Sequence, residues 1–108
     1  MIELAQDGRI VTLTLTDALD FHAVDELASA LEGIDENAVD RVIVELAKGG
    51  VFDDGAVGLL VRTGARLRTA DARLVLCGAD VRTVDALRAI GADRVVALAE
   101  SRDEALVG

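Results

Sequence analysis

Two pairs of aspartates are the residues of this sequence most able to do chemistry. Asp53 and Asp54 close a glycine-rich segment, and Asp17 and Asp20 lie between two apolar runs. If the fold brings both segments to one end of a sheet, the four carboxylates could hold Mg²⁺ or another hard cation. Each aspartate equally suits a turn or the start of a helix, and we favour that interpretation. The sequence therefore predicts no metal site and no cofactor.

The other reactive side chains do not assemble into a catalytic pattern. Cys77 is the only cysteine and His22 the only histidine, so a zinc cluster or a Ser-His-Asp relay has too few members. Cys77 lies in the apolar run RLVLC and is predicted to be a buried structural thiol. A phosphoacceptor enzyme built on Glu45 or Asp53 would need a lysine further along the chain, and none follows Lys48. We therefore expect a protein that is not an enzyme.

Charge and composition narrow the class of partner. The net charge of -9 argues against nucleic acid, and Phe21 and Phe52 are the only aromatic side chains, too few for a base-stacking platform. The charge is uneven, because residues 1–54 hold 13 acidic and 3 basic side chains whereas residues 55–108 hold 7 and 8. Ten of the 11 cationic residues are arginine, a bias typical of GC-rich bacterial genomes. No signal peptide or membrane-spanning run is evident, so we expect a cytoplasmic protein without membrane insertion.

The N-terminal segments that must position these residues have clear periodicities. Apolar residues alternate with threonines over 10–15, which predicts a half-buried strand, and Ile2 and Leu4 predict a shorter strand before it. Gly8 supplies the turn of a hairpin between them. Asp20 is a plausible N-cap for an amphipathic helix that Gly33 closes. The inward face of that helix is predicted to carry Val24, Leu27, Ala28 and Leu31.

Strands and helices alternate through the rest of the chain. Strands are predicted over 41–46, 73–77 and 95–98, and the first of these is apolar enough to lie at the centre of a sheet. Helices are predicted from about Asp54 to Thr69, after Asp80, and from Ser101, which forms a capping box with Glu104. The buried stripes of the first two of these helices are predicted to be Val57, Leu60, Val61 and Gly64, and Val84, Leu87 and Ile90.

The resulting element order is β-β-α-β-α-β-α-β-α. Alternating strands and helices predict a mostly parallel sheet with right-handed crossovers, and the opening hairpin adds one antiparallel edge strand. We therefore predict a single α/β domain over 1–108, a sandwich with about four helices. A chain of 108 residues is long enough for one hydrophobic core.

Three segments, residues 15–27, 42–58 and 86–106, resemble in sequence and in order the STAS domain family of anti-sigma factor antagonists. Residues 42–58, VIVELAKGGVFDDGAVG, are similar to the family's central motif, with Asp53 on the family's aspartate and Gly58 on its last glycine. Residues 15–27 are similar to the family's first turn and helix, and residues 86–106 to its last helices and strand. The resemblance covers nearly the whole chain and implies a STAS-like fold and a non-catalytic role in protein–protein switching.

The resemblance breaks at the residue that carries the switch. In typical members, a serine at the start of the second helix is phosphorylated by a partner anti-sigma factor kinase. Here Asp54 occupies that position and Gly55 follows it, so the usual serine kinase has no hydroxyl to modify. Asp54 either replaces serine only as the helix N-cap or fixes a permanent negative charge that partly imitates the phosphorylated state. Both interpretations lead us to expect a degenerate switch.

The resemblance also implies a partner and a surface. We expect an anti-sigma factor or serine-kinase-like partner, we leave a homodimer open, and the alternative role is a STAS subunit of a lipid-transport ABC complex or a stress-signalling complex. On the predicted second helix, Leu59 would be the apolar anchor of an exposed stripe, with Thr63 beside it and two arginines pairing with acidic groups; an ordinary solvated face is the simpler interpretation. The predicted partner-binding residues are Asp20, Gly50, Phe52, Asp53, Asp54, Gly55, Leu59, Arg62 and Arg66.

Overall fold

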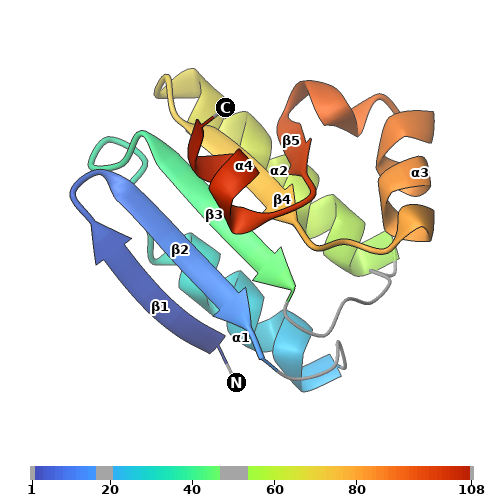
Figure 1. Ribbon diagram of the computed structural model, residues 1–108, viewed down its shortest axis with the longest axis horizontal. Helices are drawn as coiled ribbons and strands as arrows, with labels where there is room; N and C mark the ends of the chain where they lie inside the picture. The colour runs from blue at the N-terminus through green and yellow to red at the C-terminus, as the bar shows by residue number, and fades with distance from the viewer. Residues whose placement is uncertain (1, 17–20, 47–53, 108) are drawn as a thin grey trace.

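The protein forms one five-stranded sheet with helices on both faces (Figure 1). The computed structural model describes residues 2–16, 21–46 and 54–107, of which residues 21, 54 and 107 are described by their backbone alone. The elements are β1 (Ile2–Asp7), β2 (Ile10–Leu15), α1 (Phe21–Glu32), β3 (Arg41–Leu46), α2 (Asp54–Thr69), β4 (Arg73–Cys77), α3 (Val81–Ala89), the 3-10 turn η1 (Ala92–Arg94), β5 (Val96–Ala99) and α4 (Arg102–Val107).

The sheet has the predicted architecture. Its strand order is β1-β2-β3-β4-β5, with β1 antiparallel to β2 and every other neighbouring pair parallel. The hairpin turns over two residues, since Asp7 pairs with Ile10, and Gly8 takes the positive φ of 60° that such a turn needs. The α/β fold class, the antiparallel edge strand and the helix order are therefore confirmed.

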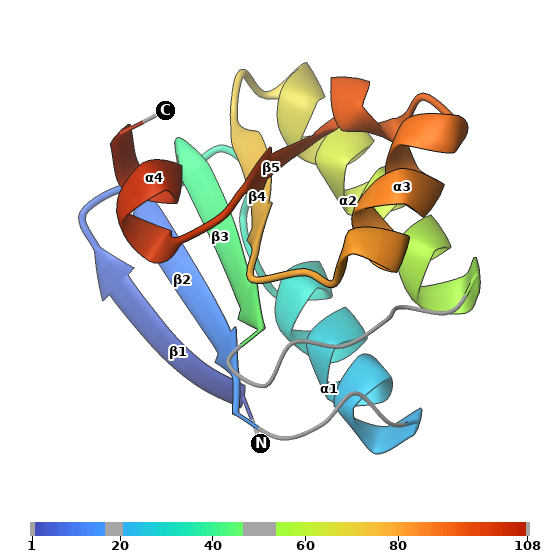
Figure 2. The ribbon, with the colours of Figure 1, turned by 45° about the vertical axis from the view of Figure 1, so that its right-hand side comes forward.

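Alternation along the strands divides the sheet into two faces of different character. Val42, Val44 and their neighbours on one face form the main core, which α1, α2 and α3 cover (Figure 2). On the other face, Ile43 of β3 packs with Val75, Cys77 and Ala105, and α4 alone covers this small cluster. We call the two sides the three-helix face and the α4 face. The central strand β3 is thus buried on both sides, as its apolar run predicts.

One close approach fixes α2 on the three-helix face. Gly64, in the middle of α2, lies against the chain just before β5, and a Cβ placed there would overlap the carbonyl oxygen of Val95. Glycine is therefore required at this position by packing rather than by its dihedral angles. Among the helices of the described ranges, none is long and apolar enough to cross a membrane.

The predicted buried stripe of α3 is wrong in one position. Leu87 is fully buried, but Ile90 is 65% exposed, and Thr83 lies inside instead. The cause is the end of the helix: α3 stops at Ala89, and Ile90 is its C-cap, with backbone angles outside the helical region. The 3.6-residue period places a side chain on the buried face only while the backbone is helical, so it does not apply to Ile90.

Candidate protein-interaction site

The candidate site is built around the first turn of α2, at the carboxyl end of the sheet. Asp54 is the first residue of this helix, Gly55 is exposed, and Ala56 behind them is buried in the main core. The side chain of Asp54 is not among those described, so its role as an N-cap stays a prediction. The predicted contact residues Asp20, Gly50, Phe52 and Asp53 lie outside the described residues.

The prediction that Leu59 is an exposed apolar anchor is wrong. Leu59 is only 7% exposed and belongs to the main core, and Thr63 one turn later is buried to the same extent. Because α2 packs against β4 beneath it and against α1 beside it, its buried face is wider than a helix lying on a sheet alone would need. Leu59 therefore stabilises the fold and is not available to a partner.

Arg66 serves the fold in a way that the sequence did not indicate. Its Nη2 donates to the carbonyl oxygens of Leu31 at 2.7 Å and Ile34 at 3.3 Å, at the end of α1, and its Nε lies 3.9 Å from Oε2 of Glu36. A cation at this position satisfies carbonyl groups that a helix leaves without intrahelical partners. Arg66 thus ties α2 to α1 through its Nη2, while its Nε is buried without a hydrogen-bond partner among the described residues.

In its N-terminal half, α2 consequently leaves only a narrow strip, the exposed Gly55 and Arg62 with the half-buried Gly58 between them, which we call the α2 strip. The three residues are spaced by three and four positions, so they lie on one side of the helix. Arg62 is exposed, and its Nη1 lies 3.3 Å from the position that a Cβ on Gly58 would take. The strip combines a smooth backbone surface with one cation, directly after the carboxylate-bearing residue Asp54.

Glu45, the one carboxylate within the central strand, has a structural role. On the α4 face, Nη2 of Arg102 lies 2.5 Å from Oε1 of Glu45 and 3.1 Å from Oγ1 of Thr14, and the threonine hydroxyl also donates to Glu45 at 3.3 Å. The hydrogen bond from Arg102 and its charge pairing with Glu45 raise the pKa of the guanidinium above its ordinary value. Glu45 therefore fastens α4 to the sheet.

Cys77 is buried beside this ion pair, as predicted. The pKa of the thiol is raised from 9.0 to about 11, mainly by burial in the α4 face and also by the negative charge of Glu45, while the positive charge of Arg102 acts in the opposite direction. A thiol with so high a pKa is protonated at neutral pH and is a poor nucleophile. In the described ranges, no group of three or more His, Cys, Asp or Glu side chains is arranged to hold a metal ion.

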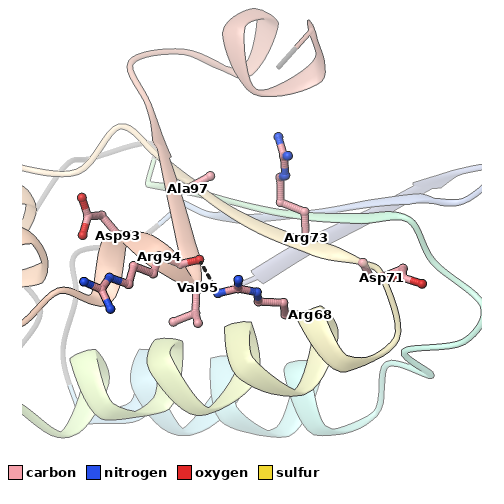
Figure 3. Close-up of a pocket in the computed structure, with 8 residues that line it drawn as sticks. Arg68, Asp71, Arg73, Asp93, Arg94, Val95 and Ala97 are labelled. Atoms are coloured by element: carbon pink, nitrogen blue, oxygen red, sulfur yellow. Dashed lines mark hydrogen bonds between the residues drawn. The ribbon is translucent and has the colours of Figure 1, made fainter.

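A hollow lies where β4 and β5 begin, at the end of the sheet opposite to the first turn of α2 (Figure 3). It is lined by arginines that were not among the predicted site residues. Its volume is about 440 Å³, and its lining includes Arg68, Arg73 and Arg94 together with Asp71 and Asp93. Arg68 donates from Nη1 to the carbonyl oxygen of Arg94 at 3.3 Å, while Arg73 points toward the α4 side and the Arg94 guanidinium points away from Arg68 (Figure 3). The three cations do not converge on one ligand, so this hollow is not an anion site.

The chain folds as a small α/β domain, and the described part of its candidate site is the start of α2 with an exposed arginine beside it. The STAS domain family model matches residues 1–105, so the chain belongs to the STAS domain family. This confirms the resemblance drawn from the three sequence segments.

Solved structures share the fold at low sequence identity. The chain is similar to the phosphorylated form of the Bacillus cell fate determinant SpoIIAA, with 21% identity, a TM-score of 0.73 and coverage of 99% of this chain and 97% of that one. It is also similar to the unphosphorylated anti-sigma factor antagonist SpoIIAA (22%, TM-score 0.67, coverage 98% and 93%) and to the protein TM1081 (14%, TM-score 0.76, coverage 99% and 86%). No curated protein matches the chain significantly in sequence.

Proposed function

We propose that this protein is a non-catalytic regulatory module of the anti-sigma factor antagonist type, with a switch position that cannot be phosphorylated. The observation that carries the proposal is the start of α2, where Asp54 is the first helical residue and Gly55 follows it. A serine kinase transfers phosphate to a hydroxyl group, and neither residue has one. The module therefore binds its partner, an anti-sigma factor or serine-kinase-like protein in the cytoplasm, without a phosphorylation cycle at this turn.

The charge at this turn is fixed rather than switched. A phosphoserine carries about -1.5 to -2 charges at neutral pH, whereas an ionised aspartate carries one and lacks the three phosphate oxygens. Asp54 is thus a weaker and permanent version of the modified state. Partners that bind only the unmodified form should bind this protein less tightly than they bind a serine variant.

The partner surface that fits the described residues is centred on the α2 strip. The strip offers Gly55 and Gly58 for close backbone contact and Arg62 for an acidic group on the partner. The predicted contacts Asp20, Gly50, Phe52 and Asp53 stay part of the proposal. Leu59 and Arg66 are removed from it, since both are engaged within the fold.

The switch is tested with the cognate anti-sigma factor kinase and ATP, read by intact mass. We expect no phosphate on the wild-type protein and one phosphate on the Asp54→Ser variant, because serine restores the acceptor hydroxyl. Binding of the Asp54→Ser variant to the kinase should be tighter before phosphorylation than after it. A phosphate on the wild type near residue 54, or a transporter ATPase as the co-purifying partner instead of a kinase, would overturn the proposal.

The surface is tested by charge reversal with a matched control. Arg62→Glu should weaken kinase binding about tenfold or more, the range expected for an arginine at the centre of an interface. Arg94→Glu is the control, because Arg94 is equally an exposed arginine but lies at the opposite end of the sheet. Equal losses for the two variants would show a nonspecific charge effect and remove the α2 strip from the interface.

A further inference from the structure

A second surface, separate from the α2 strip, lies between the edge strand β1 and the helix α1. Leu4 of β1 is 59% exposed although its register partner Leu13 is fully buried in the main core. Two hollows flank Leu4, with volumes of about 500 and 390 Å³, and both are lined by Leu4, Ser29 and Ala30. They form one groove along β1 and α1, which we call the edge groove, with Leu13 and Val11 contributing to its apolar lining.

The backbone beside this groove is available for strand pairing. β1 is the first strand in the sheet order, so only one of its sides is paired, with β2. Alternate N–H and C=O groups of an edge strand point away from the sheet, where an extended chain can add as a further strand. β1 is six residues long, Ile2–Asp7. The side chains of a strand added beside it would alternate between the same two faces of the sheet as those of β1.

Carboxylates lie close to the edge strand β1 on both faces of the sheet. On the α1 side, Asp25, Glu26 and Asp35 are exposed and line the hollows. On the other face, Glu3 and Asp7 of β1 are exposed. Among the described residues, no lysine or arginine lines either hollow.

The cation that follows β1 in the chain is already engaged. Arg9, in the turn between β1 and β2, has its Nε 2.8 Å from Oδ1 of Asp40 and donates from Nη2 to the carbonyl oxygen of Asn37 at 3.1 Å. It therefore does little to offset the charge of the five carboxylates, three that line the edge groove and two on the other face of β1. An added strand would meet acidic groups on both of its faces and an exposed leucine on one.

We propose that the edge groove binds an extended, cationic segment of a partner protein, which adds to the sheet beside β1. Apolar side chains of the segment pack on Leu4 and Ala30, and lysine or arginine side chains pair with the bordering carboxylates. A second copy of this chain fits poorly, since antiparallel β1–β1 pairing brings the same carboxylates against one another. Nucleic acid is repelled by the same charges. The site thus selects a basic peptide.

The probe for this proposal is the synthetic peptide acetyl-Lys-Lys-Leu-Lys-Val-Lys-Lys-amide, which in a strand places lysines on both faces and its two apolar side chains on one; it is titrated into ¹⁵N-labelled protein at low salt. We expect chemical-shift changes confined to 2–7 and 21–35, together with slower exchange of the outward-pointing amides of β1. The matched peptide with glutamate in place of every lysine should cause no shifts. Binding should weaken about tenfold between 50 mM and 500 mM NaCl, because the charge pairs are exposed to solvent.

Two pairs of variants distinguish binding at the edge groove from nonspecific electrostatic or hydrophobic binding. Leu4→Lys should abolish the shifts, whereas Ile90→Lys, at an equally exposed aliphatic residue on α3, should leave them unchanged. Asp25→Lys should weaken binding severalfold, whereas Asp85→Lys on α3 should not. Binding that survives Leu4→Lys, or that the glutamate peptide shares, overturns the proposal.

Sedimentation of the free protein shows whether the edge groove binds a second copy of this chain. Concentration-dependent dimers that disappear in Leu4→Lys would assign the edge groove to a second copy and overturn the proposal in favour of that occupant. Because the readout lies on β1 and α1, its failure leaves the kinase experiments on Asp54 and Arg62 unaffected.

Discussion

The two faces of the sheet are held by different forces. On the three-helix face, the described residues include 20 buried apolar side chains that form one continuous cluster. On the α4 face, the corresponding cluster has four, Ile43, Val75, Cys77 and Ala105. Polar contacts supplement it at both ends of α4: Arg102 pairs with Glu45, and Nη1 of Arg41 donates to the carbonyl oxygens of Ala105 and Leu106 at 2.6 and 2.7 Å.

The difference shows which part of the molecule can open by itself. Apolar burial on the three-helix face is shared among three helices, so no one of them can leave without exposing the others. α4 has six residues, too few to persist as a helix in water, and it depends on two arginines and one alanine for its position. We expect α4 to detach and refold locally while the rest of the domain stays intact.

The largest expected effect compares the same truncation on the two faces. Val44 of β3 faces the main core and Val75 of β4 faces α4, and both are buried. Val44→Ala should lower the free energy of unfolding by about 2 to 3 kcal/mol, since the surrounding helices cannot collapse into the cavity. Val75→Ala should cost about half as much, because α4 can shift toward the sheet. Urea denaturation measures both, and equal losses would contradict the contrast between the faces.

Much of the difference between the two faces of the sheet could be predicted from the sequence, because it depends on the hydrophobic periodicity of short segments. Alternating threonines over 10–15 predicted a strand with one buried face. The continuous apolar run over 41–46 predicted a strand buried on both sides. The helix over Asp54–Thr69 and the hydroxyl of Ser101, which accepts from the N–H of Glu104 at 3.2 Å, were also predicted. Capping and period are short-range signals, so a single sequence carries them.

What the sequence could not supply were contacts between distant segments. Leu59 was misassigned because the width of a buried helix face depends on how many neighbours pack against it, and α1 lies far from α2 in the chain. The pairing of Glu45 with Arg102 joins residues 57 positions apart. Its only trace in the sequence is a lone glutamate at the fifth position of an apolar strand. A buried-strand carboxylate of that kind indicates a partner but not which cation provides it.

A smaller effect is expected when the polar contacts that hold α4 against the sheet are removed. Arg102→Met keeps the apolar stem but removes the guanidinium from Glu45 and Thr14. The side chain is half-exposed, so global stability should fall by only about 1 kcal/mol or less. Amide protons of α4 should nevertheless exchange about tenfold faster, while those of α2 are unchanged. Arg94→Met, at an exposed arginine on η1, is the control; faster exchange throughout the chain would mean that α4 does not open separately.

The last effect is zero at neutral pH and appears only as the buried thiol titrates. The pKa of Cys77 is raised from 9.0 to about 11 in the folded protein, mainly by burial beneath α4, so the native state keeps its proton longer than the unfolded chain does. The stability that this contributes is complete below pH 9 and is lost as the pH rises toward 11. The free energy of unfolding of the wild type should therefore fall relative to Cys77→Ala over that interval, and the two curves should run parallel below it. Parallel curves throughout would mean that water already reaches the thiol in the native state, and that the α4 face is open rather than closed.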